Sequence, residues 1–375
     1  MGNCCKKLFS KKINIENEIN NFESKTSSLL YAYPSFVNEN FTLKDFTIIK
    51  CIGKGSFAKV FLVKLNKTNE YFAMKILNKS KLIKFNQINN TKNEVNIFKS
   101  VNHPFLTNLI YAFTDSNNIY FISEFMQGGE LFFHLSKKKT FKEKEVKFYM
   151  SEIFLAIEYL HKKNYIYRDL KPENILIGKD GHIKLTDFGL SKILNKNQNK
   201  TYSLVGTFQY LAPEIFINKE EGYDKNCDWF SFGVVMFELF CGYHPFDIRS
   251  VYKINKETYE KIKIPSFVGD LAKDLILKLT TFNPKERLGT NNEDDIKNHP
   301  FFRDINFNDV FNKKIEPPFI PNVESETDLK YFDKEFTQIK IDEQNTNDSN
   351  LSTNQNIEFE GFSYKPKDSN LQNND

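Results

Sequence analysis

The stretch "YRDLKPEN" (167–174) gathers three side chains whose types suit the chemistry of phosphate groups. The carboxylate of Asp169 could accept the proton of a hydroxyl group, and the ammonium group of Lys171 could neutralise charge on a phosphoryl oxygen. Asn174, and Asp187 in "DFG" (187–189), offer the hard oxygen atoms that a magnesium ion prefers. This set of residues predicts transfer of a phosphoryl group to a hydroxyl group.

A glycine-containing stretch, "GKGSFAKV" (53–60), precedes these residues. Gly53 and Gly55 would let backbone N–H groups approach phosphate oxygens without obstruction by side chains. The alternative is an ordinary tight hairpin, because short glycine motifs are not specific. Lys75 lies in an apolar stretch, where its ammonium group needs an anion, and Glu94 is the expected ion-pair partner. Glu94 could equally be a solvated helix residue.

The order of the predicted elements indicates two lobes of different kinds. β-Branched and aromatic residues predict strands at 46–53, 59–66, 71–77 and 119–126. The spacing of apolar residues predicts helices at 87–100 and 143–163 and a buried helix at 229–242. Strands first and helices later imply an α+β fold, with a small β-rich lobe joined to a larger helical lobe near 125–130.

Composition excludes several classes of protein. Of 375 residues, 40% are apolar and 38 are Phe, which indicates a packed core rather than a disordered chain. With 52 basic and 48 acidic residues, the net charge of +4 argues against a general nucleic-acid binder. Five cysteines without metal-type spacing indicate reduced thiols inside the cell. No apolar run approaches the length of about 18–20 residues that a transmembrane helix needs.

Together these motifs resemble those of eukaryotic protein kinases over residues 46–302, with Ala58 in place of the third glycine of the family. The resemblance implies that ATP and Mg²⁺ bind between two lobes. Asp169 and Lys171 would be catalytic, and Asn174 and Asp187 would hold the metal. The residues that it implies for ATP are Ile52, Gly53, Lys54, Gly55, Ser56, Phe57, Ala58, Lys59, Val60, Ala73, Lys75, Glu94, Ser123, Glu124, Met126, Glu130 and Leu176.

The same resemblance implies several internal contacts. Glu214, in "APE" (212–214), should pair with Arg287, and Asp228 should brace the backbone of the catalytic loop. A stacked apolar column should link the two lobes, although its members could also be plain core residues. The column consists of Phe98, Leu109, Tyr167 and Phe188.

The end of the chain resembles the AGC group of protein kinases, which includes protein kinases A, B and C. The stretches that carry this resemblance are "GGELFFHL" (128–135), "PPFIP" (317–321), "YFDKEFT" (331–337) and "FEGFSY" (359–364). The domains would be an extension (1–45), a kinase domain (46–302) and a tail (303–375). Phe359 and Phe362 would dock beside the Glu94 helix. Ser363 matches a phosphorylated position of the group, and Thr346 is a candidate for a second. A sticky disordered end is the alternative.

The segment "KTYSLVGTFQYLAPE" (200–214) carries a further expected phosphorylation site, Ser203. In the AGC group, the phosphoinositide-dependent kinase acts on this position. Arg168 and Lys192 are placed to receive the phosphate, which adds nearly two negative charges. Asn90 stands where the group has a histidine on the Glu94 helix, and Thr207 should position the acceptor hydroxyl group.

Three acidic residues favour protein substrates with Arg two or three positions before the acceptor Ser or Thr. Glu130, Glu173 and Glu238 match the arginine-binding positions of the group, although each could be a surface or ribose-contact residue. Ser123 precedes Glu124 of the hinge, and its small side chain predicts strong inhibition by bulky ligands of the ATP site.

The amino terminus, "MGNCCKKLFSKK", offers Gly2 for myristoylation and Cys4 and Cys5 for palmitoylation. A second lipid or a basic cluster is needed for stable anchoring, and both are present. Lys6 departs from the usual pattern, and a solvated basic leader is the alternative. We expect a cytoplasmic monomer that is associated with a membrane where it is acylated.

Two other functions compete with protein phosphorylation. A pseudokinase scaffold would bind partners without catalysis, but such proteins usually lose Lys75, Asp169, Asn174 or Asp187, which are all present. A kinase of small molecules or lipids is opposed by the segments "GTFQYLAPE" (206–214) and "LKPEN" (170–174), which resemble those of protein kinases.

Overall fold

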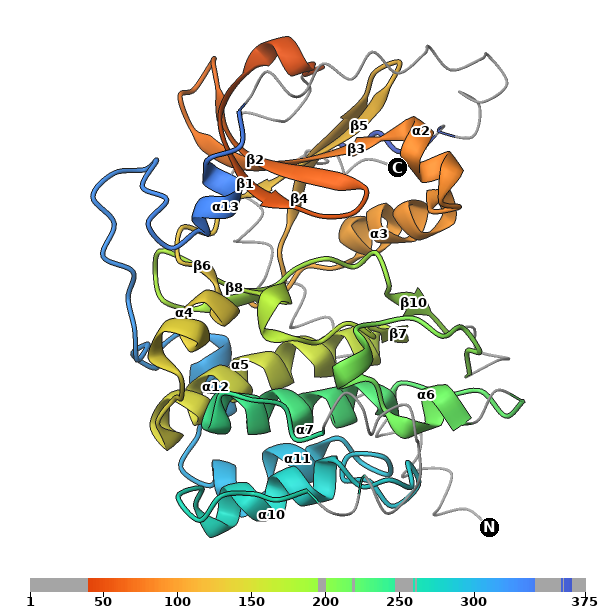
Figure 1. The fold of residues 1–375 in the computed structure, drawn as a ribbon, viewed down its shortest axis with the longest axis vertical. Coiled ribbons are helices and arrows are strands. Elements are labelled where there is room, and N and C mark those ends of the chain that lie inside the picture. Colours follow the sequence, from red (N-terminus) through yellow and green to blue (C-terminus); the bar gives the residue numbers. More distant parts are fainter. Residues whose placement is uncertain are drawn as a thin grey trace, which may run out of the picture. The chain divides into compact units, whose positions relative to one another are not determined.

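The computed structural model describes residues 40–194, 200–217, 220–246, 259, 262–340, 359 and 361–365. Within residues 42–364, strands gather at one end and most helices at the other (Figure 1), which confirms the predicted α+β fold with two lobes. Gly2, Cys4, Cys5 and Thr346 lie outside the described residues.

The small lobe contains an antiparallel sheet with the strand order β1-β2-β3-β5-β4. The four predicted strands are present, and β4 is an additional edge strand. β5 ends two residues earlier than predicted because the chain turns into the hinge, where the Gly129 N–H donates to the Met126 carbonyl (3.0 Å). The strands are β1 (Phe46–Lys54), β2 (Ala58–Leu65), β3 (Tyr71–Asn78), β4 (Leu109–Thr114) and β5 (Asn118–Glu124).

Two helices, α2 (Lys79–Lys84) and α3 (Ile88–Ser100), follow β3. Asn78 caps α2, because its side chain accepts the N–H of Lys81 (3.0 Å). α3 buries Glu94 on the same face as its apolar residues. A buried carboxylate in this position needs a cation, so the helix must face a basic group of the sheet.

The large lobe is built around two long helices, α5 (Glu143–Lys162) and α7 (Asn226–Cys241). α7 is mostly apolar and every one of its residues is buried, including Asp228 and Glu238. It begins three residues before the predicted start and ends at Gly242, whose φ of 75° suits glycine. The other helices are α4 (Leu131–Lys138), α6 (Pro213–Ile217), α10 (Asp270–Leu279), α11 (Asp294–Lys297) and α12 (Phe307–Phe311).

Short strands and 3-10 turns, which were not predicted, complete the described fold, and several of them carry residues of chemical interest. The strands are β6 (Gly129–Glu130), β7 (Tyr165–Ile166), β8 (Ile175–Ile177), β9 (Ile183–Leu185) and β10 (Lys192–Ile193). β8 pairs with both β6 and β9, whereas β7 pairs with β10. The 3-10 turns are Leu43–Asp45, Pro172–Asn174, Phe208–Tyr210 and Pro300–Phe302. These elements are too short to show periodicity, but they fix the loops between them.

The tail runs back along both lobes (Figure 1). Two glycines allow close approach: a Cβ atom would lie 2.4 Å from the Phe319 carbonyl at Gly181 and 2.3 Å from the Tyr331 carbonyl at Gly129. Helix α13 (Lys334–Thr337) then packs against β1. At the end of the tail, Tyr364 exchanges two backbone hydrogen bonds with Ala112 of the edge strand β4.

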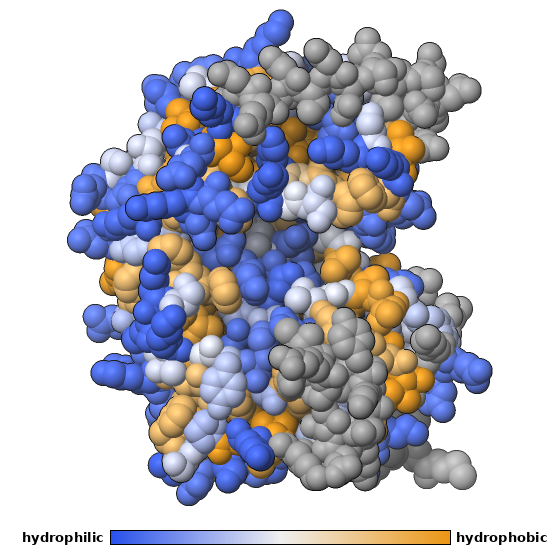
Figure 2. Space-filling model, viewed as in Figure 1, coloured by the Kyte–Doolittle hydropathy of each residue, from blue (hydrophilic) through white to orange (hydrophobic). Residues whose placement is uncertain are grey.

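The surface is hollowed between the two lobes, and hydrophilic residues line much of the hollow (Figure 2). In the described part of the chain, no helix has both the length and the apolar character that crossing a membrane requires.

Candidate active site

Three other side chains meet at the carboxylate of Asp169. Its Oδ1 accepts hydrogen bonds from the hydroxyl group (2.7 Å) and the N–H (3.1 Å) of Thr207. Its Oδ2 accepts one from Asn174 Nδ2 (2.8 Å) and lies 2.9 Å from Lys171 Nζ. Lys171 also donates to the Thr207 hydroxyl group (2.7 Å). The structure therefore brings together a proton acceptor, a cation and a hydroxyl-positioning residue, as predicted from the sequence.

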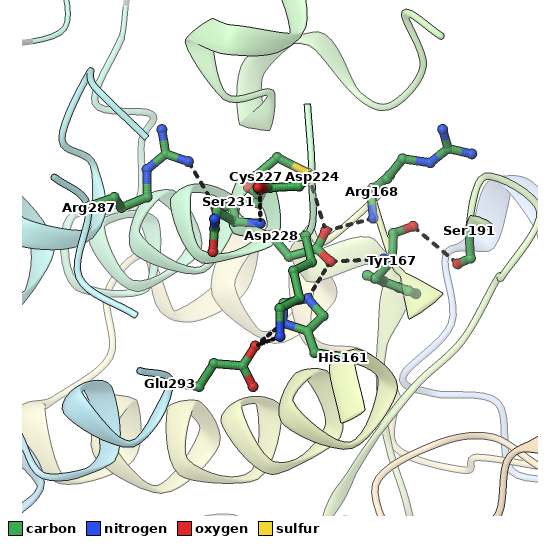
Figure 3. Close-up of polar contacts among 12 residues, drawn as sticks. His161, Tyr167, Arg168, Ser191, Asp224, Cys227, Asp228, Ser231, Arg287 and Glu293 are labelled. Carbon is green, nitrogen blue, oxygen red and sulfur yellow. Dashed lines mark hydrogen bonds and ion pairs between the residues drawn. The ribbon is translucent and has the colours of Figure 1, made fainter. Parts of the chain in front are cut away.

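A buried charged network braces the catalytic loop from below (Figure 3). Asp228 accepts the backbone N–H groups of Tyr167 (2.9 Å) and Arg168 (2.8 Å), which confirms its predicted bracing contact. Arg168 has a φ of 68°, an unfavourable conformation that these contacts help to hold. The side chain of Asp228 also meets His161 Nε2 (2.8 Å), and His161 Nδ1 meets Glu293 (2.9 Å).

His161 and Glu293 were not predicted from the sequence. Burial alone would lower the pKa of His161, but hydrogen bonds to the two carboxylates outweigh burial and raise it. The pKa of Glu293 falls to about 2, because His161 and Lys225 overcome its burial. The brace is therefore an imidazole held between two carboxyl groups. Helix α5, helix α7 and a segment near α11 supply its members, and no local sequence pattern joins them.

Lys75 on β3 forms the ion pair with Glu94 on α3 that the sequence predicts, at 2.6 Å. Asp187 lies 3.5 Å from the same ammonium group. Burial would lower the pKa of Lys75, but Asp187 and Glu94 raise it above its usual range. Lys75 in turn lowers the pKa of Asp187, against the effect of burial. The site therefore holds a permanent cation beside an ionised carboxylate.

Asn174 and Asp187 suit a magnesium ion by their chemistry. Asn174 uses its amide nitrogen to donate to Asp169, so its amide oxygen is the atom that could serve as a ligand. In the described residues, no group of three His, Cys, Asp or Glu side chains is gathered for a metal. Magnesium fits such a sparse site, because it commonly takes one or two carboxylates and completes its shell with phosphate oxygens and water.

The sheet aligns the residues expected to bind ATP along one cleft. Gly53 pairs with Val60, which pairs with Lys75, and Ala73 pairs with Ser123. Below them, Glu130 pairs with Leu176, while Ile52 and Glu130 line one pocket. The remaining glycine-loop residues of the prediction are Lys54, Gly55, Ser56, Phe57, Ala58 and Lys59, which lie on β1, β2 or the turn between them.

Glu124 and Met126, the two hinge residues predicted to bind ATP, lie in different surroundings. The carboxylate of Glu124 is engaged by Lys184 (2.6 Å) and by the N–H of Asn108 (3.2 Å). The backbone of Glu124, rather than its carboxylate, is therefore the part that could contact a nucleotide. Met126 is buried in the hinge turn, within reach of Gly178 in the large lobe.

The apolar column between the lobes is continuous at its centre. The ring of Phe188 lies edge-on to Phe98 of α3 (4.9 Å between centroids) and to Tyr167 (5.8 Å). All three rings and Leu109 are buried. The column therefore joins the helix that carries Glu94 to the loop that carries Asp169.

Acidic side chains gather at one edge of the cleft. A pocket of about 210 Å³ contains Glu130, Glu173 and Asp333. Burial, with the nearby charge of Glu173, raises the pKa of Glu130 to about 7. Asp333 comes from the tail and was missed, because its position depends on how the tail folds back. The other lining residues are aromatic except for Ile52 and Ser136: Ile52, Phe132, Phe133, Ser136, Tyr331, Phe332 and Phe336.

Glu238, the third predicted acidic residue, lies on α7 under the segment that ends at Glu214. Tyr210 donates a hydrogen bond to its Oε2 (2.8 Å), and His244 Nε2 lies 3.6 Å from its Oε1. Burial raises the pKa of Glu238 to about 7, although the Tyr210 hydrogen bond opposes this effect. Glu173 adds a repulsive charge to both Glu130 and Glu238, so the three carboxylates share one electrostatic environment.

Ser203 is exposed and lies next to a strong donor. Arg168 Nη1 donates to its hydroxyl group (2.7 Å), and the Tyr223 hydroxyl group donates to its carbonyl (2.7 Å). Lys192 instead donates to Thr201 (3.1 Å), two residues away. Asn90 turns to Gln87 (2.7 Å) within α3. The predicted pair of Glu214 and Arg287 is present as two parallel hydrogen bonds of 2.6 and 2.8 Å.

The tail motif docks beside α3, as predicted. Phe359 and Phe362 are buried, while Ser363 is exposed. Lys79 Nζ lies over the ring of Phe359 (5.1 Å to the centroid). Lys99 of α3 donates to the carbonyls of Gly361 (3.2 Å) and Ser363 (3.3 Å). The motif therefore attaches to the helix that carries Glu94.

Comparison with known families gives two matches along the chain. Residues 46–302 match the protein kinase domain, and residues 323–364 match the protein kinase C terminal domain. The first match alone covers more than half of the chain.

Curated relatives extend the similarity over most of the chain. A RAC family serine/threonine-protein kinase homolog from Dictyostelium discoideum is 42% identical over 87% of this chain and 73% of its own length. The RAC-beta serine/threonine-protein kinases of Rattus norvegicus and Homo sapiens are 41% and 40% identical, each over 91% of this chain and 72% of their own length.

Proposed function

Because this chain belongs to the protein kinase family and is an AGC serine/threonine-protein kinase of the RAC type, we propose that Asp169 is its catalytic base. The observation that supports this role is the convergence of Thr207, Lys171 and Asn174 on the Asp169 carboxylate. A substrate hydroxyl group in the place of the Thr207 hydroxyl would meet an oxygen atom that can accept its proton.

The other charged groups divide the remaining work of phosphoryl transfer. Lys75, fixed by Glu94, would hold the α- and β-phosphates of ATP, and Lys171 would neutralise the γ-phosphate. Asn174 and Asp187 would hold magnesium, which when bound neutralises charge on the phosphates. The backbone N–H groups around Gly53 and Gly55 would approach the phosphates from above. Little covalent chemistry falls to the protein, so positioning and charge supply most of the rate enhancement.

We further propose that the protein substrates carry Arg upstream of the acceptor Ser or Thr. Glu130, Glu173 and Glu238 are carboxylates with a shared negative environment at the edge of the cleft, and each can pair with a guanidinium group. Asp333 adds a fourth carboxylate beside the first two. Arg is favoured over Lys here because its fork geometry can bridge two oxygen atoms.

Regulation by phosphorylation at Ser203 and Ser363 is also part of the proposal. An upstream kinase of the phosphoinositide-dependent type would act on Ser203, whose phosphate would meet Arg168 directly. Ser363 is exposed, as a modification site must be. Thr346 remains a sequence-based candidate for a further site. We propose that the chain works as a monomer.

Membrane association through the amino terminus remains a separate proposal that rests on sequence. Myristate on Gly2 with palmitate on Cys4 or Cys5 would give the two signals that stable anchoring needs. The protein would then be cytoplasmic and peripheral to a membrane. Labelling with radioactive myristate tests this directly, because Gly2→Ala should abolish incorporation, whereas equal incorporation in both proteins would refute it.

A phosphotransfer assay tests the central proposal. The full chain, phosphorylated at Ser203, is given radiolabelled ATP, Mg²⁺ and a Ser peptide with Arg two and three positions upstream. We expect labelled peptide from the wild type and a loss of about 100-fold or more from Asp169→Asn. Equal labelling by Asp169→Asn would overturn the role of the base. No labelling of the peptide by the wild type would favour a scaffold, and labelling of lipid vesicles alone would favour a lipid kinase.

A further inference from the structure

The glycine loop touches a second aromatic residue that no motif of the sequence includes. Phe57, near the tip of the loop between β1 and β2, lies 5.2 Å from the ring of Phe85, centroid to centroid, at an angle of 55°. Phe57 is half-buried by packing against the apolar core of the small lobe. Phe85 is 50% exposed, although it is a large apolar side chain. The contact therefore holds the tip of the glycine loop against the surface of the small lobe.

The backbone around Phe85 is well anchored. Phe85 follows the last turn of α2, and its N–H donates to the Lys81 carbonyl (3.0 Å). The chain then turns through Asn86, with a φ of 53°, and the Gln87 N–H donates to the Leu82 carbonyl (2.8 Å). α3 starts at the next residue. Phe85 thus sits on a fixed corner between two helices.

Apart from the ring of Phe57, the loop tip lacks comparable anchoring. Gly55 and Ser56 are exposed, and the turn is closed by the hydrogen bond from the Gly55 N–H to the Ala58 carbonyl (2.9 Å). Glycine costs more conformational entropy to order than other residues do, so this loop needs outside contacts to stay in one position. The ring of Phe57 supplies such a contact at the corner.

We propose that Phe85 is a positioning residue for the nucleotide: it holds Phe57, and thereby keeps the glycine loop closed over the phosphates. Helix α3, which carries Glu94, also begins at this corner. The same corner therefore supports both the closed glycine loop and the ion pair of Lys75 with Glu94. A loop that is ordered before ATP arrives loses less entropy on binding. This inference rests on the proposed function, in which ATP occupies the cleft.

The effect should fall on nucleotide binding rather than on chemistry. A loop that contacts ATP equally in the ground state and in the transition state stabilises both states by the same amount. Loss of this contact raises KM and leaves kcat unchanged. Aromatic pairs of this kind contribute enough to change an equilibrium about two- to tenfold. We therefore expect Phe85→Ala to raise the KM for ATP by about two- to tenfold, with kcat and the KM for the peptide unchanged.

The test compares full-length variants by steady-state kinetics and by hydrogen exchange of residues 53–60. Phe85→Ala and Phe57→Ala should each raise the KM for ATP and speed exchange in the loop, and the double variant should add little to either one. Phe267→Ala, at a ring that is 66% exposed in the large lobe, is the matched control. If Phe85→Ala unfolds at a lower temperature than the wild type, Phe85→Leu, which keeps the apolar volume, replaces it.

Each outcome bears on one claim. Two results would overturn the role of Phe85, provided that the wild type is active. One is an unchanged KM for ATP in Phe85→Ala. The other is a double variant in which the effects of the two single variants multiply. If the wild type neither binds a non-hydrolysable ATP analogue nor labels the peptide, the proposed function fails first, and this inference fails with it. A raised KM for ATP with the control unchanged supports it.

Discussion

Two regions flank the active site and are built from different interactions. Around Ser203 the contacts are polar and converge on Arg168, the neighbour of Asp169. Around the tail motif, aromatic rings are buried beside α3, which carries Glu94. A charge added to the first region would act on the catalytic loop, whereas packing in the second acts on the phosphate-holding lysine. The kinase therefore has separate supports for Asp169, the proposed base, and for Lys75, the proposed phosphate-binding residue.

The contacts of Asn90 sharpen this contrast. A side chain reaching from α3 to the activation segment would tie the two regions together, but Asn90 bonds to Gln87 within its own helix. The link that the structure shows runs instead through the apolar column, from Phe98 to Phe188 to Tyr167. We therefore expect the two regions to contribute independently to activity unless the column itself is disturbed.

The largest effect should come from removing an anchor of the tail. Phe362 is 1% exposed, and truncating a buried aromatic ring to Ala typically costs about 3–5 kcal/mol. Phe362→Ala should detach the motif from α3 and lower kcat/KM by up to about 100-fold, even with Ser203 phosphorylated. Phe362→Leu, which keeps an apolar anchor, should retain most of the activity. Full activity in Phe362→Ala would show that α3 holds its position without the tail.

A smaller effect is expected at the polar region. Ser203→Ala removes the acceptor of a phosphate that would bond to Arg168, and a hydrogen bond to a charged group contributes about 1.5–3 kcal/mol. We expect kcat/KM to fall about tenfold or more relative to the phosphorylated wild type. Hydrogen exchange near Ala112 and Tyr364 should not change. Faster exchange there would mean that the activation segment also supports the tail.

The double variant Ser203→Ala/Phe362→Leu tests independence directly. If the two regions act separately and share no partner, the fold-losses in kcat/KM of the two single variants should multiply in the double variant, to within about twofold. A combined loss well below the product would reveal coupling through the column. Adding Phe98→Leu, which alters the first ring of the column, should then increase any such coupling or abolish it. This measurement distinguishes two supports from one shared switch.

The catalytic loop and the tail motif could both be predicted from the sequence. Asp169, Lys171 and Asn174 lie within one short loop, so their spacing alone fixes which atoms can meet. The tail motif was predicted because two aromatic anchors at fixed spacing follow a recognisable kinase domain. In both cases the backbone between the residues is short, and local geometry carries most of the information.

The contacts that no motif covers, between segments far apart in the chain, could not be predicted from the sequence. His161, Asp228 and Glu293 come from three elements, and only their packing places the imidazole between the two carboxyl groups. Asp333 reaches the acidic pocket because the tail folds back over Gly129. Lys192 was expected near Ser203 but bonds to Thr201, since a shift of two residues along an extended segment changes the neighbour. These contacts depend on the path of the folded chain rather than on composition or on the spacing of residues.

The smallest predicted effect concerns the acidic residues Glu130 and Glu238. The pKa values of Glu130 and Glu238 are raised to about 7, so both carboxylates gain charge as the pH rises through 7. A guanidinium group binds the ionised form, so kcat/KM for an Arg-containing peptide should rise by up to about tenfold between pH 6 and pH 8. A peptide with Ala in place of the upstream Arg should lack this rise, and Glu130→Gln should flatten it. Identical pH profiles for the two peptides would mean that the pocket does not read the arginine.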